Sequence, residues 1–319
     1  MSTPPSSAQL AESPPNAFSL AASGPFSLGA SIRFLEGFAP AAGQAEQQGD
    51  RLTLAFAVER SWQPVAVQVE QSKHRVLVRF TGDADSAVVQ RQVQRILSLD
   101  VDGADFPAVG ERDPVAGRLQ RRYPGLRPVG FWSPYEAAAW TILSQRIRIV
   151  QAARLKQQIT DLYGDALTID GRTLRAFPAP QRLLRLKRIP GVPEVKLGWL
   201  HAVARAAIDG VLDGERIRAL PADSAIEQLQ EIAGIGPFSA ELILIRGAGA
   251  PDVFPNQERR LHDTMGAAYG QPSADVEKLR QIAERWRPYR SWVGLLFRTA
   301  REDDTHEIAG VARPLTGRH

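Results

Sequence analysis

The sequence predicts an α+β protein in which a small N-terminal antiparallel sheet domain precedes an all-α core. Residues 52–58, 65–69 and 75–80 alternate polar and apolar side chains or run through β-branched ones, which is typical of strands. From residue 113 onward the apolar residues recur at helical spacing instead. A repeat of fixed period is not visible, so the chain is not expected to be a repeat protein.

The chain divides into two predicted domains and two predicted tails. Residues 1–24 are rich in Pro, Ser and Ala, carry one charged side chain, and are expected to be disordered. Residues 25–112 form the predicted sheet domain, and residues 113–302 form the predicted helical core. The polar residues 303–319 are expected to be a loose C-terminal tail.

The helices follow from apolar spacing and from capping signals. Residues 83–99 predict a helix behind the sheet. Ser133-Pro-Tyr-Glu136 is a capping box with Pro at the first helical position, and it predicts a helix that continues to about Ser144. Eight further helices are expected, at residues 148–163, 180–186, 195–209, 224–232, 238–246, 257–269, 274–287 and 291–301.

A short glycine turn between two of these helices is the most informative feature of the chain. In Gly234-Ile-Gly236, glycine permits a positive φ and the close approach of another surface. Pro237 then suits the first turn of the next helix, whose free N–H groups point out of the bare turn. That geometry binds an anion such as a DNA phosphate. The alternative is an ordinary corner between two helices with a glycine C-cap.

An acidic residue follows this turn at a fixed distance, in the segment Asp252-Val-Phe-Pro-Asn-Gln-Glu258. The pattern L-x-x-I-x-G-I-G-P-x-x-A followed by D-V-F-P resembles the helix–hairpin–helix DNA glycosylases, most of all the bacterial 3-methyladenine DNA glycosylase II group. Residues 124–130, 135–145 and 283–292 resemble family segments in family order. The resemblance covers roughly residues 25–302 and implies that the core is a helix–hairpin–helix glycosylase domain.

The resemblance implies a monofunctional DNA glycosylase that excises alkylated purines by hydrolysing the N-glycosidic bond in base excision repair. A carboxylate stabilises the oxocarbenium-like transition state and orients water. In the family this carboxylate is an Asp, and its position, 20 residues beyond Phe238, falls on Glu258 in this chain. The side chain of Glu is one methylene longer, which displaces the carboxylate by on the order of 1 Å. A displacement of that size can lower the rate ~10²-fold. His262 lies four positions after Glu258 and could hydrogen-bond it, although a surface or core-edge histidine is the favoured interpretation. The alternatives are that Glu258 only complements the helix dipole, or that Asp263 is the catalytic acid.

The expected base pocket contains aromatic walls and one arginine. Phe238 stands where strand-cutting members of the family have a Schiff-base lysine, and it is expected to stack on the flipped base. Phe34 and Trp292 are candidate further walls, with core packing as the alternative for each aromatic residue. Arg298 falls where the family pocket has a Trp, so it would repel a cationic base and could pair with Glu258.

The resemblance also implies contacts to the DNA backbone and to a bound ion. At the end of a helix, Gln145 and Arg146 are the candidate wedge that fills the gap left by the flipped base, unless Arg146 is simply solvated. Contacts to phosphate are expected around Gly234, Gly236, Phe238 and Ser239. A structural Na⁺ or K⁺ is expected on three hairpin carbonyls, those of Gln230, Ile232 and Ile235.

Composition limits the remaining possibilities. The net charge of +4 and the pI near 9.6 permit a polyanionic partner. The absence of cysteine excludes disulfides and the four-cysteine iron–sulfur cluster of some relatives, and a required cofactor is not expected. Neither a membrane-spanning run nor a secretory signal is visible. We therefore expect a monomeric, cytoplasmic, nucleoid-associated bacterial protein that acts on double-stranded DNA with alkylated bases.

The two departures from the family pattern, at Glu258 and Arg298, leave two other functions open. One is a non-catalytic or weakly active protein that binds damaged DNA. The other is a glycosylase for neutral or bulky lesions, which an arginine in the pocket would favour over cationic ones.

Overall fold

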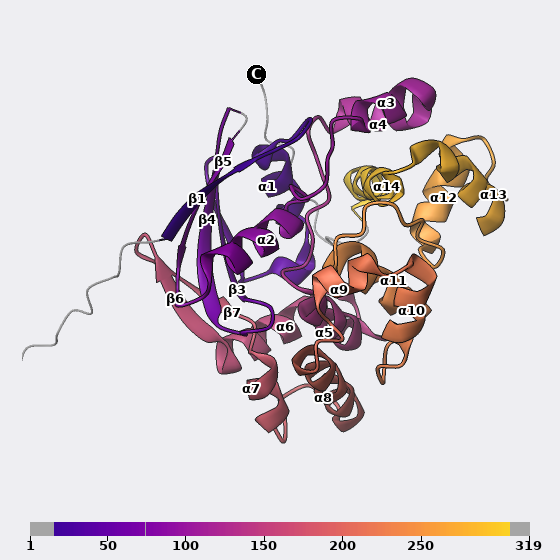
Figure 1. Ribbon diagram of the computed structural model, residues 1–319. Helices are drawn as coiled ribbons and strands as arrows, with labels where there is room; N and C mark the ends of the chain where they lie inside the picture. Colours follow the sequence, from indigo (N-terminus) through magenta and orange to yellow (C-terminus); the bar gives the residue numbers. More distant parts are fainter. Residues whose placement is uncertain (1–15, 74, 307–319) are drawn as a thin grey trace, which may run out of the picture.

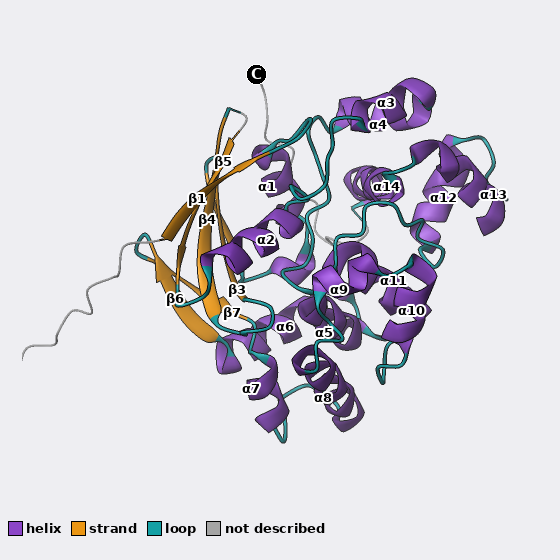
Figure 2. Cartoon of the chain, in the orientation of Figure 1, coloured by secondary structure: helices purple, strands orange, loops and turns teal. Residues whose placement is uncertain are grey.

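The computed structural model describes residues 16–73 and 75–306 of the chain. A twisted sheet stands on one side and a body of helices on the other, as predicted for an α+β protein (Figures 1 and 2). The first 15 and last 13 residues of the predicted tails lie outside the described residues. In the described part of the chain, none of the helices is long and apolar enough to cross a membrane.

The N-terminal domain is a five-stranded antiparallel sheet in the order β1-β5-β4-β3-β2. Its apolar face packs on the helices α1 (Leu28–Glu36) and α2 (Ser86–Ile96). The three strands expected from the sequence are confirmed as β3, β4 and β5, and the helix expected at 83–99 is α2. The strands are β1 (Asn16–Ala21), β2 (Ala45–Gln48), β3 (Arg51–Ala57), β4 (Pro64–Ser72) and β5 (Arg75–Thr81).

The edge strand β1 corrects the prediction that residues 1–24 form a disordered tail. Residues 16–21 pair with β5 along their whole length, and the side chain of Leu20 is buried in the core. Six residues of weak alternation inside a Pro-, Ser- and Ala-rich stretch give little local signal. The strand is stabilised by its partner, which composition does not reveal.

The core is helical except for one β-hairpin, which corrects the expectation of an all-α core. Strands β6 (Asp165–Ile169) and β7 (Arg172–Ala176) pair around Asp170-Gly171, where both residues have positive φ. Asp-Gly between two alternating segments is a strong sequence signal for a β-hairpin. The prediction of an all-α core relied on apolar spacing alone and overlooked this signal. The hairpin contacts β3 and β4 and buries Leu174 against the sheet.

The remaining core helices pack in two clusters, one that contains α5 and one that contains α14. Helix α14 extends through Thr305, so residues 303–305 are helical rather than part of a loose tail. The helices are α3 (Phe106–Arg112), α4 (Pro114–Arg122), α5 (Pro134–Ser144), α6 (Ile149–Tyr163), α7 (Pro180–Arg185), α8 (Glu194–Ile208), α9 (Gly214–Ala219), α10 (Ala222–Gln230), α11 (Pro237–Leu242), α12 (Arg259–Ala268), α13 (Val276–Ala283) and α14 (Arg290–Thr305), with short turns at η1 (Ala39–Ala41), η2 (Ile243–Gly247, a π-turn) and η3 (Glu284–Trp286).

Helix α5 begins at the predicted capping signal, but only half of the capping box forms. The Ser133 hydroxyl accepts a hydrogen bond from the Glu136 backbone N–H at 3.1 Å. The Glu136 carboxylate is buried instead against Lys156 Nζ at 3.2 Å and Gln44 Nε2 at 3.0 Å. Burial raises the pKa of Glu136 and lowers that of Lys156. The pair ties α5 to α6, and Gln44 ties both to the N-terminal domain.

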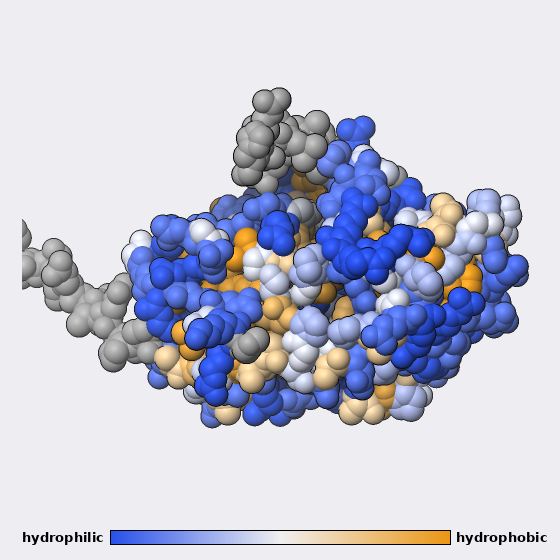
Figure 3. Space-filling view, turned by 90° about the horizontal axis from the view of Figure 1, so that it is seen from above, coloured by the Kyte–Doolittle hydropathy of each residue, from blue (hydrophilic) through white to orange (hydrophobic). Residues whose placement is uncertain are grey.

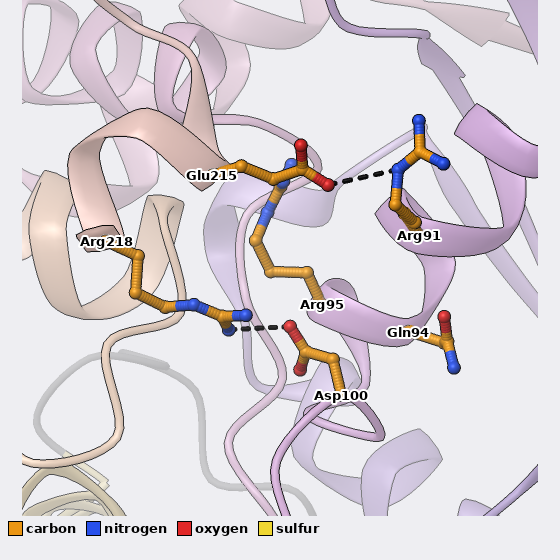
Figure 4. A pocket seen from close by; sticks show the side chains of 6 residues that line it. All are labelled: Arg91, Gln94, Arg95, Asp100, Glu215 and Arg218. Atoms are coloured by element: carbon orange, nitrogen blue, oxygen red, sulfur yellow. Dashed lines mark hydrogen bonds and ion pairs between the residues drawn. The ribbon is translucent and has the colours of Figure 1, made fainter.

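A small cavity of about 130 Å³ marks the contact between α2 and α9 (Figure 4). Arg95 lies between two ion pairs there, and it is itself paired with a buried carboxylate. Because each arginine is matched by an acid, this cavity is a charge-balanced contact between the two domains rather than an anion site. The pairs are Arg91–Glu215 at 3.0 Å, Arg218–Asp100 at 2.6 Å, and Arg95–Glu59.

Candidate active site

A much larger cleft, of about 1410 Å³, lies between the N-terminal domain and the helical core. Its walls come from α1, η1, α4, α5, α11, α12 and α14. Viewed from above, the protein surface is mostly hydrophilic with smaller apolar areas between the polar ones (Figure 3). Six of the site residues predicted from the sequence line this cleft: Phe34, Gln145, Phe238, Ser239, Glu258 and Arg298.

The glycine turn joins α10 to α11, and its two glycines have different roles. Gly234 has φ +88°, and a Cβ there would lie 2.7 Å from the Trp199 ring and 2.8 Å from Ile142 Cδ1. Gly236 has an extended backbone, and a Cβ there would meet nothing within 4 Å. Packing therefore requires glycine at position 234. At position 236 the missing side chain leaves the N-terminus of α11 open.

The loop after α5 is fastened to this turn. Gln145 Nε2 donates a hydrogen bond to the Gly234 carbonyl at 2.9 Å. Lys196 Nζ donates to the carbonyls of Leu143 and Gln145 at 2.9 and 2.8 Å, which holds the end of the helix. Arg146 follows in the left-handed region, at φ 57°, with an exposed side chain. It lies beside the cleft and not among its lining residues.

Glu258 lies at the N-cap of α12 and faces the cleft. Its carboxylate Oε1 lies 3.8 Å from Arg298 Nε on α14, which confirms the expected pairing of these two residues. The two side chains are only 22% and 21% exposed, respectively, and burial lowers the pKa of Arg298. The cleft therefore holds a partly desolvated carboxylate whose charge is partly offset by a neighbouring guanidinium.

His262 does not hydrogen-bond Glu258, in agreement with the favoured interpretation of a core-edge histidine. His262 Nε2 hydrogen-bonds the Pro255 carbonyl at 2.8 Å, and its ring stacks on Phe254. The reason is local: α12 begins at residue 259, so Glu258 precedes the helix and does not share a helical face with His262. Asp263, the alternative acid, is 69% exposed beside Arg301 and does not line the cleft.

Two aromatic surfaces line the cleft. Phe238, at the start of α11, is 47% exposed, which is unusual for a large apolar side chain. Phe34 packs against Phe38, with ring centroids 5.6 Å apart. The Arg246 guanidinium lies over both of these rings, at 5.2 and 4.8 Å from their centroids. Burial lowers the pKa of Arg246 to about 10, so the group remains cationic at neutral pH.

Trp292 does not belong to this site, contrary to the sequence prediction. It is 2% exposed, packs edge-on against Phe106, and is covered by the Arg127 guanidinium at 5.1 Å. Helix α14 directs this residue into the core, whereas Arg298, farther along the same helix, faces the cleft. A flipped base could not reach Trp292 without displacing Arg127 and Phe106.

None of the protein-family models matches the chain, but individual known proteins are similar to it. The DNA-3-methyladenine glycosylase of Bacillus subtilis (strain 168) is 24% identical over 259 residues, covering 77% of this chain and 85% of that protein. The DNA-3-methyladenine glycosylase 2 of Escherichia coli (strain K12) is 34% identical over 181 residues, 55% of this chain and 61% of that protein.

A solved structure extends this similarity to the whole fold. The 3-methyladenine DNA-glycosylase from Archaeoglobus fulgidus superposes with a TM-score of 0.75 at 20% sequence identity, covering 91% of this chain and all of that one. The chain therefore shares the fold of that glycosylase. In sequence it is similar to proteins named DNA-3-methyladenine glycosylases, as the motifs predicted.

Phe38, Glu241 and Arg246 are among the residues of this cleft that sequence reasoning missed. A signal was present for the two charged ones. Glu241 and Arg246 stand at the two ends of the apolar run at residues 242–245 that follows the glycine turn. A charge beside buried apolar residues is costly unless it is paired or functional. Phe38 lies in an irregular segment with no periodic pattern, so only the folded structure reveals it.

Proposed function

We propose that this protein is a DNA glycosylase of base excision repair that hydrolyses the bond between an alkylated purine and its sugar. The observation that carries the proposal is the pairing of an exposed aromatic, Phe238, with a carboxylate, Glu258, in one cleft beside the glycine turn. The similarity to DNA-3-methyladenine glycosylases supports the same class of substrate. We expect it to act as a monomer on double-stranded DNA, at the nucleoid in the bacterial cytoplasm.

The chemistry follows from the cleft residues. A nucleotide flips out of the duplex, and its base enters the cleft against Phe238 and Phe34. As the bond to the base breaks, its electron pair leaves with the base and positive charge develops on the sugar. Glu258 stabilises that charge and accepts a proton from the water that attacks the sugar carbon. Arg146 is the proposed wedge in the emptied stack, with Gln145 supporting its loop.

The direct test is mass spectrometry of the bases released from methylated duplex DNA, with binding to an abasic-analogue duplex measured in parallel. Release of 3-methyladenine or 7-methylguanine would support the proposed glycosylase. Tight binding without release would support the alternative, a damaged-DNA-binding protein with little or no activity. Release confined to neutral or bulky bases would support the second alternative, which the nearness of Arg298 to Glu258 favours.

We further propose that the enzyme is monofunctional and uses water as its nucleophile. Phe238 offers no amine, and none of the described residues that line the cleft is a lysine. Lys196 lies close by along the α5 loop, but its ammonium group is engaged with two backbone carbonyls.

Borohydride treatment of the protein with abasic DNA is therefore expected to trap no covalent adduct. A glycosylase with a lysine at the position of Phe238 serves as the positive control under the same conditions. A trapped adduct would contradict the monofunctional assignment. Its loss in a Lys196→Met variant would then identify the amine responsible.

The open N-terminus of α11 is the proposed phosphate site, with contacts around Gly234, Gly236, Phe238 and Ser239. Gly236→Asp is expected to weaken binding to any duplex by about tenfold and to make the salt dependence shallower by about one unit of slope, because one phosphate contact is lost and like charge is added. Fluorescence anisotropy over a salt series measures both quantities.

Gly236→Asn is the matched control, because it adds the same bulk without the charge. Gly234→Asp is unsuitable, since its Cβ would collide with Trp199 and impair folding. If a folded Gly236→Asp variant kept both the affinity and the salt slope of the wild type, the glycine turn would be only a structural corner.

The turn also fits the proposed alkali ion. Ile235 donates its N–H to the Ile232 carbonyl at 3.0 Å, which keeps these two residues within one tight turn. A carbonyl oxygen has a second lone pair, so this hydrogen bond does not prevent it from binding a cation. Na⁺ or K⁺ on the carbonyls of Gln230, Ile232 and Ile235 would attract the phosphate. It would take no part in bond breaking, and the reaction requires no cofactor.

A further inference from the structure

Glu241 is a buried carboxylate one helical turn beyond Phe238, and only 5% of it is exposed. Its two oxygens accept hydrogen bonds from two consecutive backbone N–H groups. Oε1 accepts from Asn256 at 3.1 Å, and Oε2 accepts from Gln257 at 2.9 Å. Asn256 and Gln257 are the two residues directly before Glu258. Glu241 thus connects the helix that presents the aromatic wall to the segment that presents the catalytic carboxylate.

Burying this carboxylate has a cost that a purely packing role would not require. Burial raises the pKa of Glu241, which means that the surroundings disfavour its charged form. An apolar residue at this position would avoid that cost in a run that is otherwise apolar. The compensation comes from the two hydrogen bonds to backbone amides, each of which is stronger for being made to an ionised acceptor. The two hydrogen bonds to Glu241 therefore hold the loop in place, and the energetic cost is the desolvation of the Glu241 carboxylate.

The position of Glu258 depends on this loop more than on its own helix. Residues 251–258 contain no helix or strand, and Glu258 itself has a non-helical backbone, with φ −91° and ψ 82°. Farther back, Ser291 Oγ accepts from the Val253 backbone N–H at 3.1 Å. Between that anchor and α12, the contacts to Glu241 hold the backbone of the loop against α11.

We infer that Glu241 is a positioning residue that sets the place of the Glu258 carboxylate relative to the base held by Phe238. This inference rests on the proposed function. The Glu258 side chain is long and rotatable, and it extends from this loop. A shift of the loop backbone therefore moves the carboxylate relative to the sugar. A misplacement of about 1 Å costs on the order of 10²-fold in rate.

Glu241→Gln tests this role because it keeps the size and shape of the side chain. Gln offers one acceptor oxygen and turns an NH₂ group toward the second backbone N–H, so one of the two hydrogen bonds is lost. The single-turnover rate of base release is expected to fall about tenfold to a hundredfold. Affinity for an abasic-analogue duplex is expected to stay within about twofold, because the phosphate contacts are untouched. Glu231→Gln, an exposed residue before the turn, is the matched control.

A double variant separates positioning from a general structural effect. If Glu241 acts through Glu258, then adding Glu241→Gln to Glu258→Gln lowers the rate no further. Additive losses, or a wild-type rate in Glu241→Gln alone, would overturn the inference. If Glu241→Gln fails to fold, Glu241→Asp takes its place, since it keeps the charge and shortens the reach, and the same non-additivity is expected.

The failure of this inference is distinguishable from the failure of the proposed function. A wild-type protein that releases no base refutes the function itself. A wild-type rate in Glu258→Gln alone refutes the assignment of Glu258, and this inference with it. Full base release by the wild type, a slow Glu258→Gln and an unaffected Glu241→Gln would refute only the positioning role.

Discussion

Glu258→Gln is expected to lower the rate of base release on the order of 10²- to 10³-fold while leaving the fold intact. The carboxylate lines the cleft together with Phe238 and lies 3.8 Å from Arg298, and its charge is the one proposed to stabilise the positive charge that develops on the sugar. Gln has the same shape but no charge, so binding of the base against Phe238 is preserved. The measurement is single-turnover release from methylated duplex DNA under enzyme excess.

Stability should change little in this variant. The ion pair to Arg298 is 3.8 Å long and about a fifth exposed, and such pairs contribute about 0–1 kcal/mol. Thermal unfolding of both proteins checks this point. Asp263→Asn is the matched control, because that carboxylate lies on α12, which Glu258 precedes, but away from the cleft. A wild-type rate in Glu258→Gln, together with a slow Asp263→Asn, would transfer the catalytic role to Asp263.

Where local sequence determined the geometry, the sequence predictions agree with the structure. Strand β5 alternates buried and less buried residues, β3 and β4 are mostly buried runs rich in apolar residues, and Ser133 caps α5 as the local sequence predicts. The turn at Gly234 needs a positive φ that glycine permits, so its place in the chain was evident. Glu258 was located by its spacing from that turn, and it does line the cleft.

Where a partner distant in sequence determines the geometry, local pattern was insufficient. Trp292 and Arg298 lie on one helix, and only the packing of Arg127 and Phe106 decides which of the two faces the cleft. Glu136 matched a capping box, yet it pairs with Lys156, 20 positions away. The proposed role of Glu241 depends on its contact with Asn256, a loop residue 15 positions later. Such contacts leave no periodic trace in the sequence.

Arg298→Trp is expected to raise the release of cationic bases relative to neutral ones by about tenfold. In the wild type, the guanidinium faces the cleft beside Glu258 and repels a positively charged base. An indole removes that repulsion and adds cation–π attraction of about 0.5–2 kcal/mol, and 1.4 kcal/mol corresponds to tenfold. Loss of the pairing also frees the charge of Glu258, which acts in the same direction because a carboxylate attracts a cationic base more than a neutral one.

The experiment compares release rates for 7-methylguanine and for a neutral lesion in both proteins. Arg298→Met is the control that separates charge from stacking: it removes the cation without supplying a π-face, so its ratio should fall between those of the wild type and Arg298→Trp. An unchanged ratio with both rates measurable would mean that Arg298 does not set lesion choice. A uniform loss of affinity for all DNA would mark it as a phosphate contact instead. In every variant the cationic Arg246 guanidinium still lies over the Phe34 and Phe38 rings. A preference for neutral bases that persists in Arg298→Trp would therefore be assigned to Arg246.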